Sequence, residues 1–234
     1  MQLFYHPDIT ENSSVFSFDA ATHHHIVKVM RKTEGDLLYI TNGKGWLFTA
    51  TLTHIHTKRC TVTITNAEQK IRQNYYLHLA VAPTKSNERY EWFLEKAVEI
   101  GVHEITPLIC SRSERKHIKP ERFKKIIAAA MQQSLQYYLP KFNEAVSFRN
   151  FITSSFKGQL FMAHCGNSER SALKRSVLSN HTVTVLIGPE GDFSEDEIQS
   201  AIKKGFIPVS LGNTRLRIET AAIAACHTLA LINE

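Results

Sequence analysis

Arg217 and Glu219 stand two positions apart near the end of the chain, where a loop carrying Gly212 and Arg215 enters a run of small residues. An arginine can stabilise negative charge that develops on a substrate, and a neighbouring carboxylate can orient the arginine or accept a proton. The alternative is an ion pair on the surface, which would contribute little to stability. The residues alone leave both interpretations open.

A second candidate is the segment Gly188-Pro189-Glu190-Gly191, which follows the apolar run 182–187. Glycine allows a backbone to approach a ligand closely, although an ordinary tight turn would use the same residues. The chain contains neither a GxGxxG fingerprint nor a GxxxxGK(S/T) motif. Binding of a dinucleotide or of a nucleoside triphosphate therefore lacks its usual support.

Positive charge is concentrated in residues 112–125, within a chain whose net charge is +6. The basic residues of this segment are Arg112, Arg115, Lys116, Lys119, Arg122, Lys124 and Lys125. A basic cluster neutralises phosphates and releases counterions, which is the sequence-independent part of nucleic-acid affinity. A solvated helix face could have the same composition, so the charge alone does not distinguish a nucleic-acid-binding surface from an ordinary solvated helix.

No metal site is expected from the cysteines and histidines. Cys60, Cys110, Cys165 and Cys226 lie far apart without a CxxC pair, so we predict reduced thiols that are buried as small apolar side chains. The consecutive histidines at 23–25 cannot converge on one ion from a single helix or strand.

The composition is that of a folded globular protein. The chain has 234 residues, of which 43% are hydrophobic and 21% charged, which suits one large or two small domains and excludes a disordered chain. No apolar run approaches the roughly 20 residues of a membrane helix, and the first residues lack a signal-peptide pattern. We therefore expect a soluble, cytoplasmic protein.

Residues 1–70 are predicted to form a small, mostly β module. Strand patterns rich in alternating or β-branched residues cover 36–41, 46–55 and 60–65. The Asn-Gly pair at 42–43 is typical of a β-hairpin. One short helix is expected at about 20–31, and the polar stretch 67–74 is the predicted linker.

From residue 74 onward, strand and helix patterns alternate. The expected strands are 76–82, 105–110, 159–164, 182–187 and 207–211, and the expected helices are 87–100, 120–138, 194–205 and 219–232. Alternation of this kind predicts a mainly parallel sheet covered by helices, with ligands bound beyond the carboxyl ends of the strands. Ser194 and Glu197 form a predicted capping box, with Phe193 and Ile198 as its hydrophobic staple.

The order and spacing of these segments resemble the RsmE family of small-subunit rRNA uridine-N3 methyltransferases, which belongs to the SPOUT superfamily. The similarity covers almost the whole chain. It is carried by Leu186 to Gly191 with Phe193-Ser194 and Glu197-Ile198, by Leu211-Gly212 with Leu216-Arg217 and Glu219-Thr220-Ala221, and by parts of 24–36 and 95–108.

The resemblance implies an α/β protein in which an N-terminal PUA-like β-barrel is followed by a SPOUT α/β domain with a C-terminal trefoil knot. The corresponding boundaries are 1–70 for the RNA-binding domain and 74–234 for the methyltransferase domain. Members of the family act as homodimers and bind S-adenosylmethionine in the loops of the knot. The residues thereby assigned to the cofactor are Ile187, Gly188, Glu190, Gly191, Leu211, Gly212 and Leu216.

The implied reaction is transfer of a methyl group to N3 of a uridine in 16S rRNA, in free RNA or in the 30S subunit, without a metal. The protein must align the electrophile and help a weakly acidic imide to lose its proton. We expect Arg217 to stabilise charge on the uracil oxygens and Glu219 to orient Arg217 or take part in proton removal. The residues expected to bind RNA are Arg31, Lys85, Arg112, Arg115 and Lys116.

Four residues of the two candidate loops depart from the family pattern. Asp192 stands where a second glycine is common, Thr214-Arg215 stand where Arg-Ile is common, and Ile218 replaces a frequent threonine. Which of Arg215 and Arg217 faces the uracil is therefore left open.

Two other functions are compatible with the sequence. A SPOUT methyltransferase acting on tRNA or on a ribose 2′-OH would share the cofactor loops and the basic segment. A non-catalytic RNA-binding or ribosome-assembly protein would have no reason to bind S-adenosylmethionine, so binding of the cofactor separates the two classes.

Overall fold

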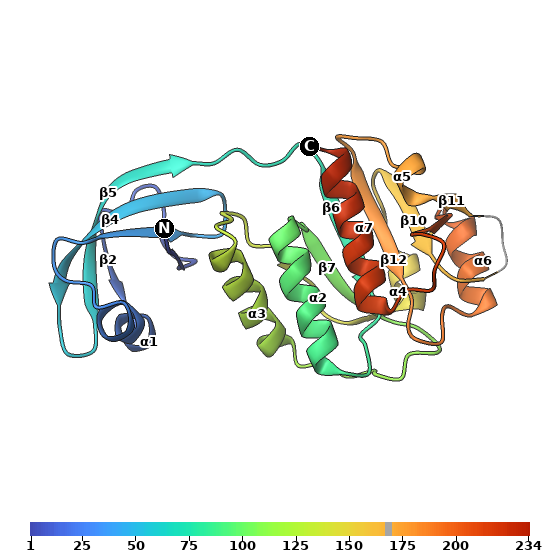
Figure 1. The fold of residues 1–234 in the computed structure, drawn as a ribbon, viewed down its shortest axis with the longest axis horizontal. Helices are drawn as coiled ribbons and strands as arrows, with labels where there is room; N and C mark the ends of the chain where they lie inside the picture. The colour runs from blue at the N-terminus through green and yellow to red at the C-terminus, as the bar shows by residue number, and fades with distance from the viewer. Residues whose placement is uncertain (167–169) are drawn as a thin grey trace. The chain divides into compact units, whose positions relative to one another are not determined.

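The computed structural model of the chain describes residues 1–166 and 170–234, and its fold is shown in Figure 1. The chain divides into two compact units. Unit 1 comprises Met1–Arg72 together with Met131–Leu139, and unit 2 comprises Gln73–Ala130 and Pro140–Glu234. None of the described helices is long and apolar enough to cross a membrane.

Unit 1 is built on a five-stranded sheet in the order β1-β3-β4-β5-β2. The strands are β1 (Leu3–Tyr5), β2 (Val15–Phe18), β3 (Leu37–Thr41), β4 (Trp46–Ile55) and β5 (Cys60–Gln69). β1 pairs with β3 in parallel, and the remaining pairs are antiparallel. The predicted hairpin is confirmed: β3 and β4 are joined by a turn in which Gly43 has φ 70° and Gly45 has φ 94°.

The core of unit 1 lies between this sheet and a short helical segment. α1 (Ala20–His24) is capped by Asp19, whose carboxylate accepts from the Thr22 N–H at 2.8 Å, and it continues into the π-helix η1 (His25–Val29). Ile26 on η1 is buried in one cluster with Phe18 and Phe48. The helix expected at 20–31 is therefore confirmed but ends at Val29.

The sequence missed two strands of unit 1 and misplaced the start of the linker. β1 and β2 were not predicted, because strands of three and four residues at the ends of a sheet are too short to show a clear period. The linker predicted to begin at residue 67 begins later, since β5 continues to Gln69.

The helix predicted at 120–138 also ends early. α3 (Pro120–Gln133) stops before Leu135, which has φ 57°. Beyond it, the Tyr137 carbonyl accepts from the Gly45 N–H at 2.9 Å, and the Leu139 N–H donates to the Gly43 carbonyl at 2.8 Å. These backbone groups pair with the hairpin turn of unit 1 and are not available to a helix.

Unit 2 contains an eight-stranded sheet in which every neighbouring pair is parallel, so the predicted parallel sheet is confirmed. The order is β11-β13-β10-β12-β6-β7-β8, and β9 pairs with β7. The strands are β6 (Tyr76–Val81), β7 (Glu104–Ile109), β8 (Lys141–Phe142), β9 (Val146–Ser147), β10 (Gln159–Ala163), β11 (Ser171–Ala172), β12 (Thr182–Ile187) and β13 (Ile207–Ser210).

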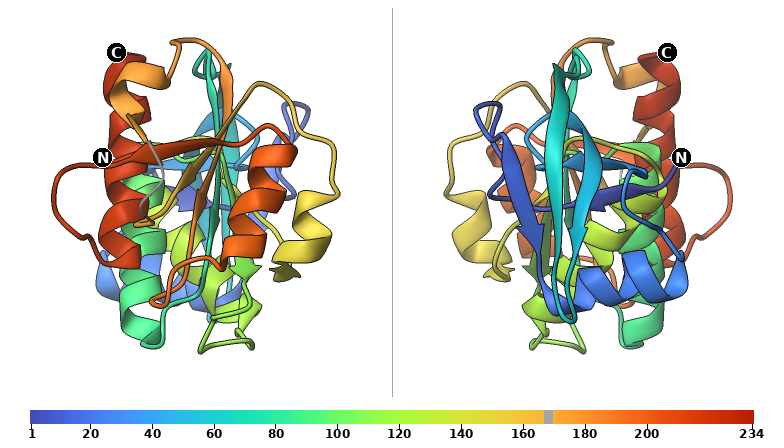
Figure 2. Two further views of the ribbon diagram at one scale, coloured as in Figure 1. Left: turned by 90° about the vertical axis from the view of Figure 1, so that its right-hand side faces the viewer. Right: turned by 90° about the vertical axis from the view of Figure 1, so that its left-hand side faces the viewer.

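Helices cover both faces of this sheet (Figure 2). α2 (Asn87–Ile100) and α7 (Ile218–Ile232) lie side by side on one face. α4 (Phe148–Ile152) and α6 (Glu195–Lys203) lie on the other face, and α5 (Leu173–Ser176) is a single short turn. The sheet is thus a buried layer whose carboxyl edge is formed by the loops after β10, β12 and β13.

The start of α6 agrees with the sequence pattern. The Glu197 N–H donates to Ser194 Oγ at 3.3 Å, and Glu197 Oε2 accepts from the Ser194 N–H at 2.9 Å. Phe193 and Ile198 are buried in the same apolar cluster. The predicted capping box is confirmed, and it fixes where the loop after β12 ends.

Candidate active site

A pocket of about 330 Å³ lies at the carboxyl ends of β10, β12 and β13, within unit 2. Its walls come from the segments that follow these three strands and from Arg89 on the first turn of α2. This is the edge of a parallel sheet at which ligands bind.

Most of the residues expected to bind a cofactor line this pocket. They are Ile187, Gly188, Glu190, Leu211, Gly212 and Leu216. The expected catalytic residues Arg217 and Glu219 line it as well. Gly191 is not part of the lining, and a Cβ added there would lie 3.2 Å from Cβ of Arg112. The fold therefore brings together the two loops that the sequence singled out.

The loop after β12 is a tight turn that requires special backbone geometry at two positions. A Cβ added at Gly188 would lie 2.9 Å from the Phe193 ring, so only glycine fits beneath that side chain. Asp192 has φ 61°, and its N–H donates to the Pro189 carbonyl at 2.9 Å. Aspartate tolerates this left-handed conformation better than most residues, which accounts for its presence where the family often has glycine.

The Asp192 side chain connects two loops of the pocket. Its Oδ2 accepts from the Cys165 N–H at 2.8 Å, and its Oδ1 accepts from the Phe193 N–H at 2.8 Å. Asp192, Cys165 and His164 all line the pocket. The carboxylate thus ties the segment after β10 to the segment after β12.

His164 is an uncharged part of the pocket wall. Burial lowers the pKa of its ring, and the nearby Asp192 carboxylate opposes that effect only in part. The Gly166 N–H donates to His164 Nδ1 at 3.1 Å, so this nitrogen acts as an acceptor. Three of the four cysteines are buried as the sequence predicted, but the prediction is wrong for Cys165, whose thiol is exposed in the loop after β10.

Glu219 pairs with Arg89. It lies in the first turn of α7 with only 8% of its surface exposed, and its Oε1 is 3.9 Å from Arg89 Nε. Among the ion pairs of the described residues, none joins Arg217 to Glu219. Arg217 is exposed at the N-terminal cap of α7, and its carbonyl accepts from the Ala221 N–H at 2.8 Å.

Two of the residues expected to bind RNA contact the loop after β12. Arg112 Nη1 donates to the carbonyls of Gly191 at 3.0 Å and Phe193 at 3.3 Å. The Lys85 N–H donates to Glu190 Oε1 at 2.9 Å, while its largely exposed side chain forms an ion pair in which Nζ is 3.1 Å from Glu114 Oε2. Both residues therefore support the pocket, and the Lys85 ammonium can also reach a ligand.

The other residues expected to bind RNA lie elsewhere. Arg115 Nη1 is buried without a hydrogen-bond partner in the described part of the chain. Lys116 is exposed in the same segment, before α3. Arg31 belongs to unit 1, where it has φ 57° directly after η1.

The sequence did not assign His164, Cys165, Asp192 or Arg89 to this site. The strand that ends before His164 was expected, but its place beside β12 and β13 is a property of the sheet order. Only the departure of Asp192 from the family's glycine was a local signal.

The chemistry of the pocket is that of charged side chains and backbone groups. Its arginines are Arg89, Arg170, Arg215 and Arg217, and its carboxylates are Glu190, Asp192 and Glu219. Within residues 1–166 and 170–234, no three His, Cys, Asp or Glu side chains cluster as a metal site would require.

Comparison with known proteins agrees with this arrangement. Residues 52–230 match the family model of the RNA methyltransferase domain, and residues 18–65 match that of the RNA methyltransferase PUA domain. A relative from Borreliella burgdorferi, ribosomal RNA small subunit methyltransferase E 2, is 31% identical over 88% of this chain and 86% of its own length. The chain belongs to the RsmE family of RNA methyltransferases.

Two solved structures of family members are similar over nearly the whole chain. A probable rRNA-methyltransferase from Porphyromonas gingivalis is 37% identical with a TM-score of 0.93, covering 100% of this chain and 98% of that one. Ribosomal RNA small subunit methyltransferase E from Neisseria gonorrhoeae, bound to S-adenosyl methionine, is 25% identical with a TM-score of 0.85, covering 97% and 95%. The resemblance and the PUA domain inferred from the sequence are confirmed.

Proposed function

We propose that this protein transfers a methyl group from S-adenosylmethionine to N3 of a uridine in 16S rRNA. The observation that carries the proposal is the pocket at the carboxyl edge of the sheet, where both glycine-containing loops meet Arg217 and Glu219. The names of the relatives support small-subunit rRNA as the substrate. The uridine and its N3 atom are inferred from the family resemblance.

The residues of the pocket suit S-adenosylmethionine. Glycine backbone permits close approach, the carboxylates complement a cationic sulfonium, and the apolar side chains of Ile187, Leu211 and Leu216 suit an adenine ring. When bound, this group supplies an activated methyl. We assign its binding to Ile187, Gly188, Glu190, Gly191, Leu211, Gly212 and Leu216, with Gly191 acting through the shape of the loop.

Arg217 and Glu219 are the proposed catalytic residues. In this proposal the Arg217 side chain, which lines the pocket, stabilises negative charge on the uracil oxygens as N3 loses its proton. Glu219 is largely buried and paired with Arg89, so it can take part in proton removal while Arg89 fixes its position. Arg89 is thus a positioning residue in this scheme.

For RNA binding we propose Arg31, Lys85, Arg112, Arg115 and Lys116. The corresponding organisation has residues 1–70 as an RNA-binding domain and 74–234 as the methyltransferase domain, acting on 16S rRNA or the 30S subunit. Exposure of Lys116 and of the Lys85 ammonium favours contacts with phosphates. Arg112 contributes through the loop that it supports.

We further propose a homodimer, a C-terminal trefoil knot and a cytoplasmic location. The dimer is supported by exposed apolar side chains on adjacent helices, Trp92 on α2 and Leu231 on α7. The knot follows from the family resemblance and is compatible with α7 returning from β13, which lies between β11 and β10, to pack on α2.

The test is incorporation of labelled methyl from S-adenosylmethionine into unmodified 30S subunits, followed by mass-spectrometric analysis of nucleosides. We expect N3-methyluridine with the wild type and at least a hundredfold lower rate with Arg217→Ala. Arg175→Ala, which changes an exposed arginine on α5, is the matched control. Wild-type turnover by Arg217→Ala with saturating RNA and cofactor would remove the proposed role of that residue.

A further inference from the structure

Three neighbouring strands of unit 2 carry polar side chains on one face of the sheet, in the first half of each strand. β12, β6 and β7 are adjacent, and their register sets Thr182 beside Tyr76, Thr184 beside His78, and His78 beside Glu104. Since side chains alternate between faces, every second residue of each strand shares this face. The row consists of Tyr76, His78, Glu104, Thr106, Thr182 and Thr184.

A polar row is unusual at this position. Central strands of a parallel sheet are covered on both faces and are normally apolar throughout. Further along the same face the strands follow that rule, with Ala80, Leu108 and Leu186 buried against α4 and α6. Thr106 and Thr184 are each only 3% exposed. Buried polar residues lower stability unless they are hydrogen-bonded, and departures of this kind from the usual pattern are expected at functional sites.

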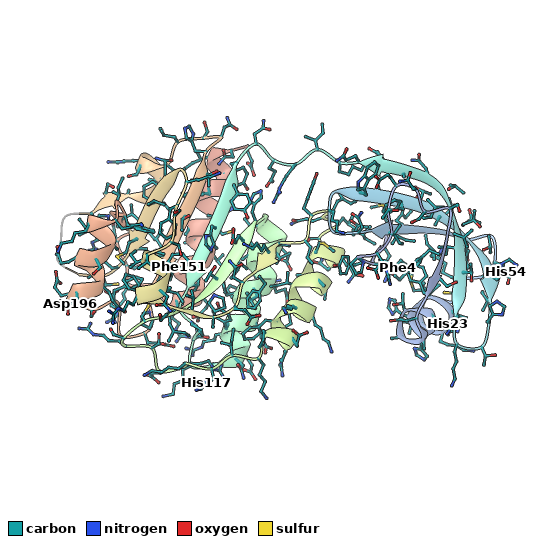
Figure 3. All side chains as sticks on the ribbon, turned by 180° about the vertical axis from the view of Figure 1, so that it is seen from behind. Phe4, His23, His54, His117, Phe151 and Asp196 are labelled. Atoms are coloured by element: carbon teal, nitrogen blue, oxygen red, sulfur yellow. The ribbon has the colours of Figure 1, made fainter. Side chains whose placement is uncertain are left out.

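A cavity of about 500 Å³ lies over this row. Its apolar wall is formed by Val146, Phe151 and Phe156. The Phe151 ring, labelled in Figure 3, belongs to α4, with its centroid 5.7 Å from the His78 ring and 5.2 Å from the Phe156 ring. The cavity therefore combines an aromatic wall with a polar floor.

The charges of the floor are already paired. Glu104 accepts from the Tyr76 hydroxyl at 2.8 Å, from Lys141 Nζ at 2.9 Å and from Asn143 Nδ2 at 2.7 Å. Burial raises the pKa of Glu104, but these hydrogen bonds outweigh it and bring the pKa to about 2. The carboxylate is thus ionised and its bonding capacity is largely occupied.

The remaining floor is neutral and able to form hydrogen bonds. Asn143 Nδ2 also donates to Thr106 Oγ1 at 2.7 Å, and Thr106 Oγ1 is 2.7 Å from His78 Nε2. Burial lowers the pKa of His78, which keeps its ring uncharged. The groups presented to a ligand are therefore an imidazole and the hydroxyls of Thr182 and Thr184.

We propose that this cavity is a binding site for a nucleobase. A flat ring can stack on phenylalanine and histidine side chains while its polar edge meets the threonine hydroxyls and the imidazole, which is how unpaired bases are bound elsewhere. Lys157 also lines the cavity and its ammonium group can pair with a phosphate, but a phosphate alone would make no use of the aromatic wall. The inference rests on the polar row and its cavity, and it stands apart from the proposed methyl transfer.

The site is distinct from the pocket at the carboxyl edge. Thr182 begins β12 and Gly188 follows its end, so the two sites are separated by roughly 13–20 Å along the strand. An RNA strand of a few nucleotides could reach both. The same chemistry would also bind a free nucleoside, and the experiment separates these sources.

The experiment is calorimetric titration of uridine, cytidine, adenosine and guanosine into the full-length protein saturated with S-adenosylhomocysteine, which fills the carboxyl-edge pocket. We expect at least one nucleoside to bind the wild type, and its Kd to rise about tenfold or more in the double variant Thr182→Val and Thr184→Val. Valine keeps the shape and removes only the hydroxyls. Thr63→Val on β5 of unit 1 is the matched control.

The affinity for S-adenosylhomocysteine serves as the folding control and is expected to be unchanged, since its pocket is elsewhere. Should the double variant misfold, Phe156→Leu at the rim replaces it, with the same expected loss of binding. Absence of nucleoside binding to the wild type, or equal binding to the wild type and the variants, would overturn the proposal. Failure of the wild type to bind S-adenosylhomocysteine would count against the proposed function only.

A second titration uses a short single-stranded RNA. If its Kd rises in the double variant by the same factor as that of the nucleoside, the base belongs to an RNA strand. If the RNA affinity is unchanged while nucleoside binding is lost, the occupant is a free nucleoside. Either result supports a site for a base.

Discussion

Asp192 has an unfavourable backbone conformation in the loop after β12, and hydrogen bonds from backbone N–H groups to its side chain offset the cost. Its left-handed φ of 61° is offset by two charge-assisted hydrogen bonds to backbone N–H groups. Asp192→Asn replaces one accepting oxygen with an amide group that faces a donor. We expect the free energy of unfolding to fall by about 1–3 kcal/mol, measured by urea denaturation.

The control for this change is Asp8→Asn, because the Asp8 side chain is 82% exposed. We expect that substitution to alter stability by no more than about 0.5 kcal/mol. Equal stability of Asp192→Asn and the wild type would mean that the two hydrogen bonds do not stabilise the loop.

Arg89 and Glu219 should act as one unit in catalysis. Their side chains approach to 3.9 Å, and Glu219 is largely buried, so removing Arg89 leaves its carboxylate without its charged partner. We expect Glu219→Gln to lower kcat about a hundredfold and Arg89→Ala about tenfold. The double variant should be no slower than Glu219→Gln alone. Single-turnover kinetics with saturating cofactor measure all three, and additive losses would show that the residues act independently.

At the scale of elements, the sequence predicted the helix ends that depend on contacts between residues close together in the chain. The capping box of α6 depends on neighbours within a few positions, and it is present as predicted. The end of α3 depends on hydrogen bonds between the backbone of a distant hairpin turn and the Tyr137 carbonyl and Leu139 N–H, and no local pattern carries that information. For the same reason the approach of Arg89 to Glu219 could not be predicted from the sequence.

Glu104 joins β7 to β6 and to the segment around β8, and its contribution to stability should depend on pH. Its pKa is about 2 in the folded chain against an ordinary value of 4.5. As the pH falls below 4.5 the unfolded chain binds the proton first, so the stabilisation is present at neutral pH and is lost between about pH 4.5 and 2. Allowing for partial exposure, it amounts to roughly 1–3 kcal/mol.

Urea denaturation of Glu104→Gln and the wild type at pH 7 and pH 3 measures this contribution. We expect the difference in unfolding free energy between the two proteins to be smaller at pH 3 than at pH 7. Glu11→Gln, at an exposed position of unit 1, should show no such change. A difference that stays constant with pH would contradict the assignment of the low pKa.

At the scale of the whole molecule, the sequence predicted the fold class because strand and helix periods alternate from residue 76 onward. It could not predict the sheet order, since β10 lies between β12 and β13 without any sequence signal for that neighbour. The candidate site depends on that order, because it brings the loop after β10 to the other two. His164 and Cys165 could be assigned to the pocket only once the order of the strands was known.

The distribution of charge over the molecule leads to a last prediction, about binding of RNA. The chain has a net charge of +6, but Arg122 and Lys124 are paired with carboxylates. Lys116 and Lys119 remain exposed, with no ion pair among those of the described residues. If they contact phosphates, the double variant Lys116→Gln and Lys119→Gln should weaken binding and flatten its dependence on salt. The slope of log K against log salt should decrease by roughly 1.4–1.8.

The double variant Lys203→Gln and Lys204→Gln at the end of α6 removes the same net charge from another part of unit 2 and is the matched control. Fluorescence anisotropy with a labelled 16S rRNA fragment at several salt concentrations measures both variants. A general effect of net charge would change the two slopes equally, because each variant loses two positive charges. A specific RNA-binding surface in the segment before α3 would change the slope only for the double variant Lys116→Gln and Lys119→Gln. The proposed binding mode therefore predicts unequal slopes for the two double variants.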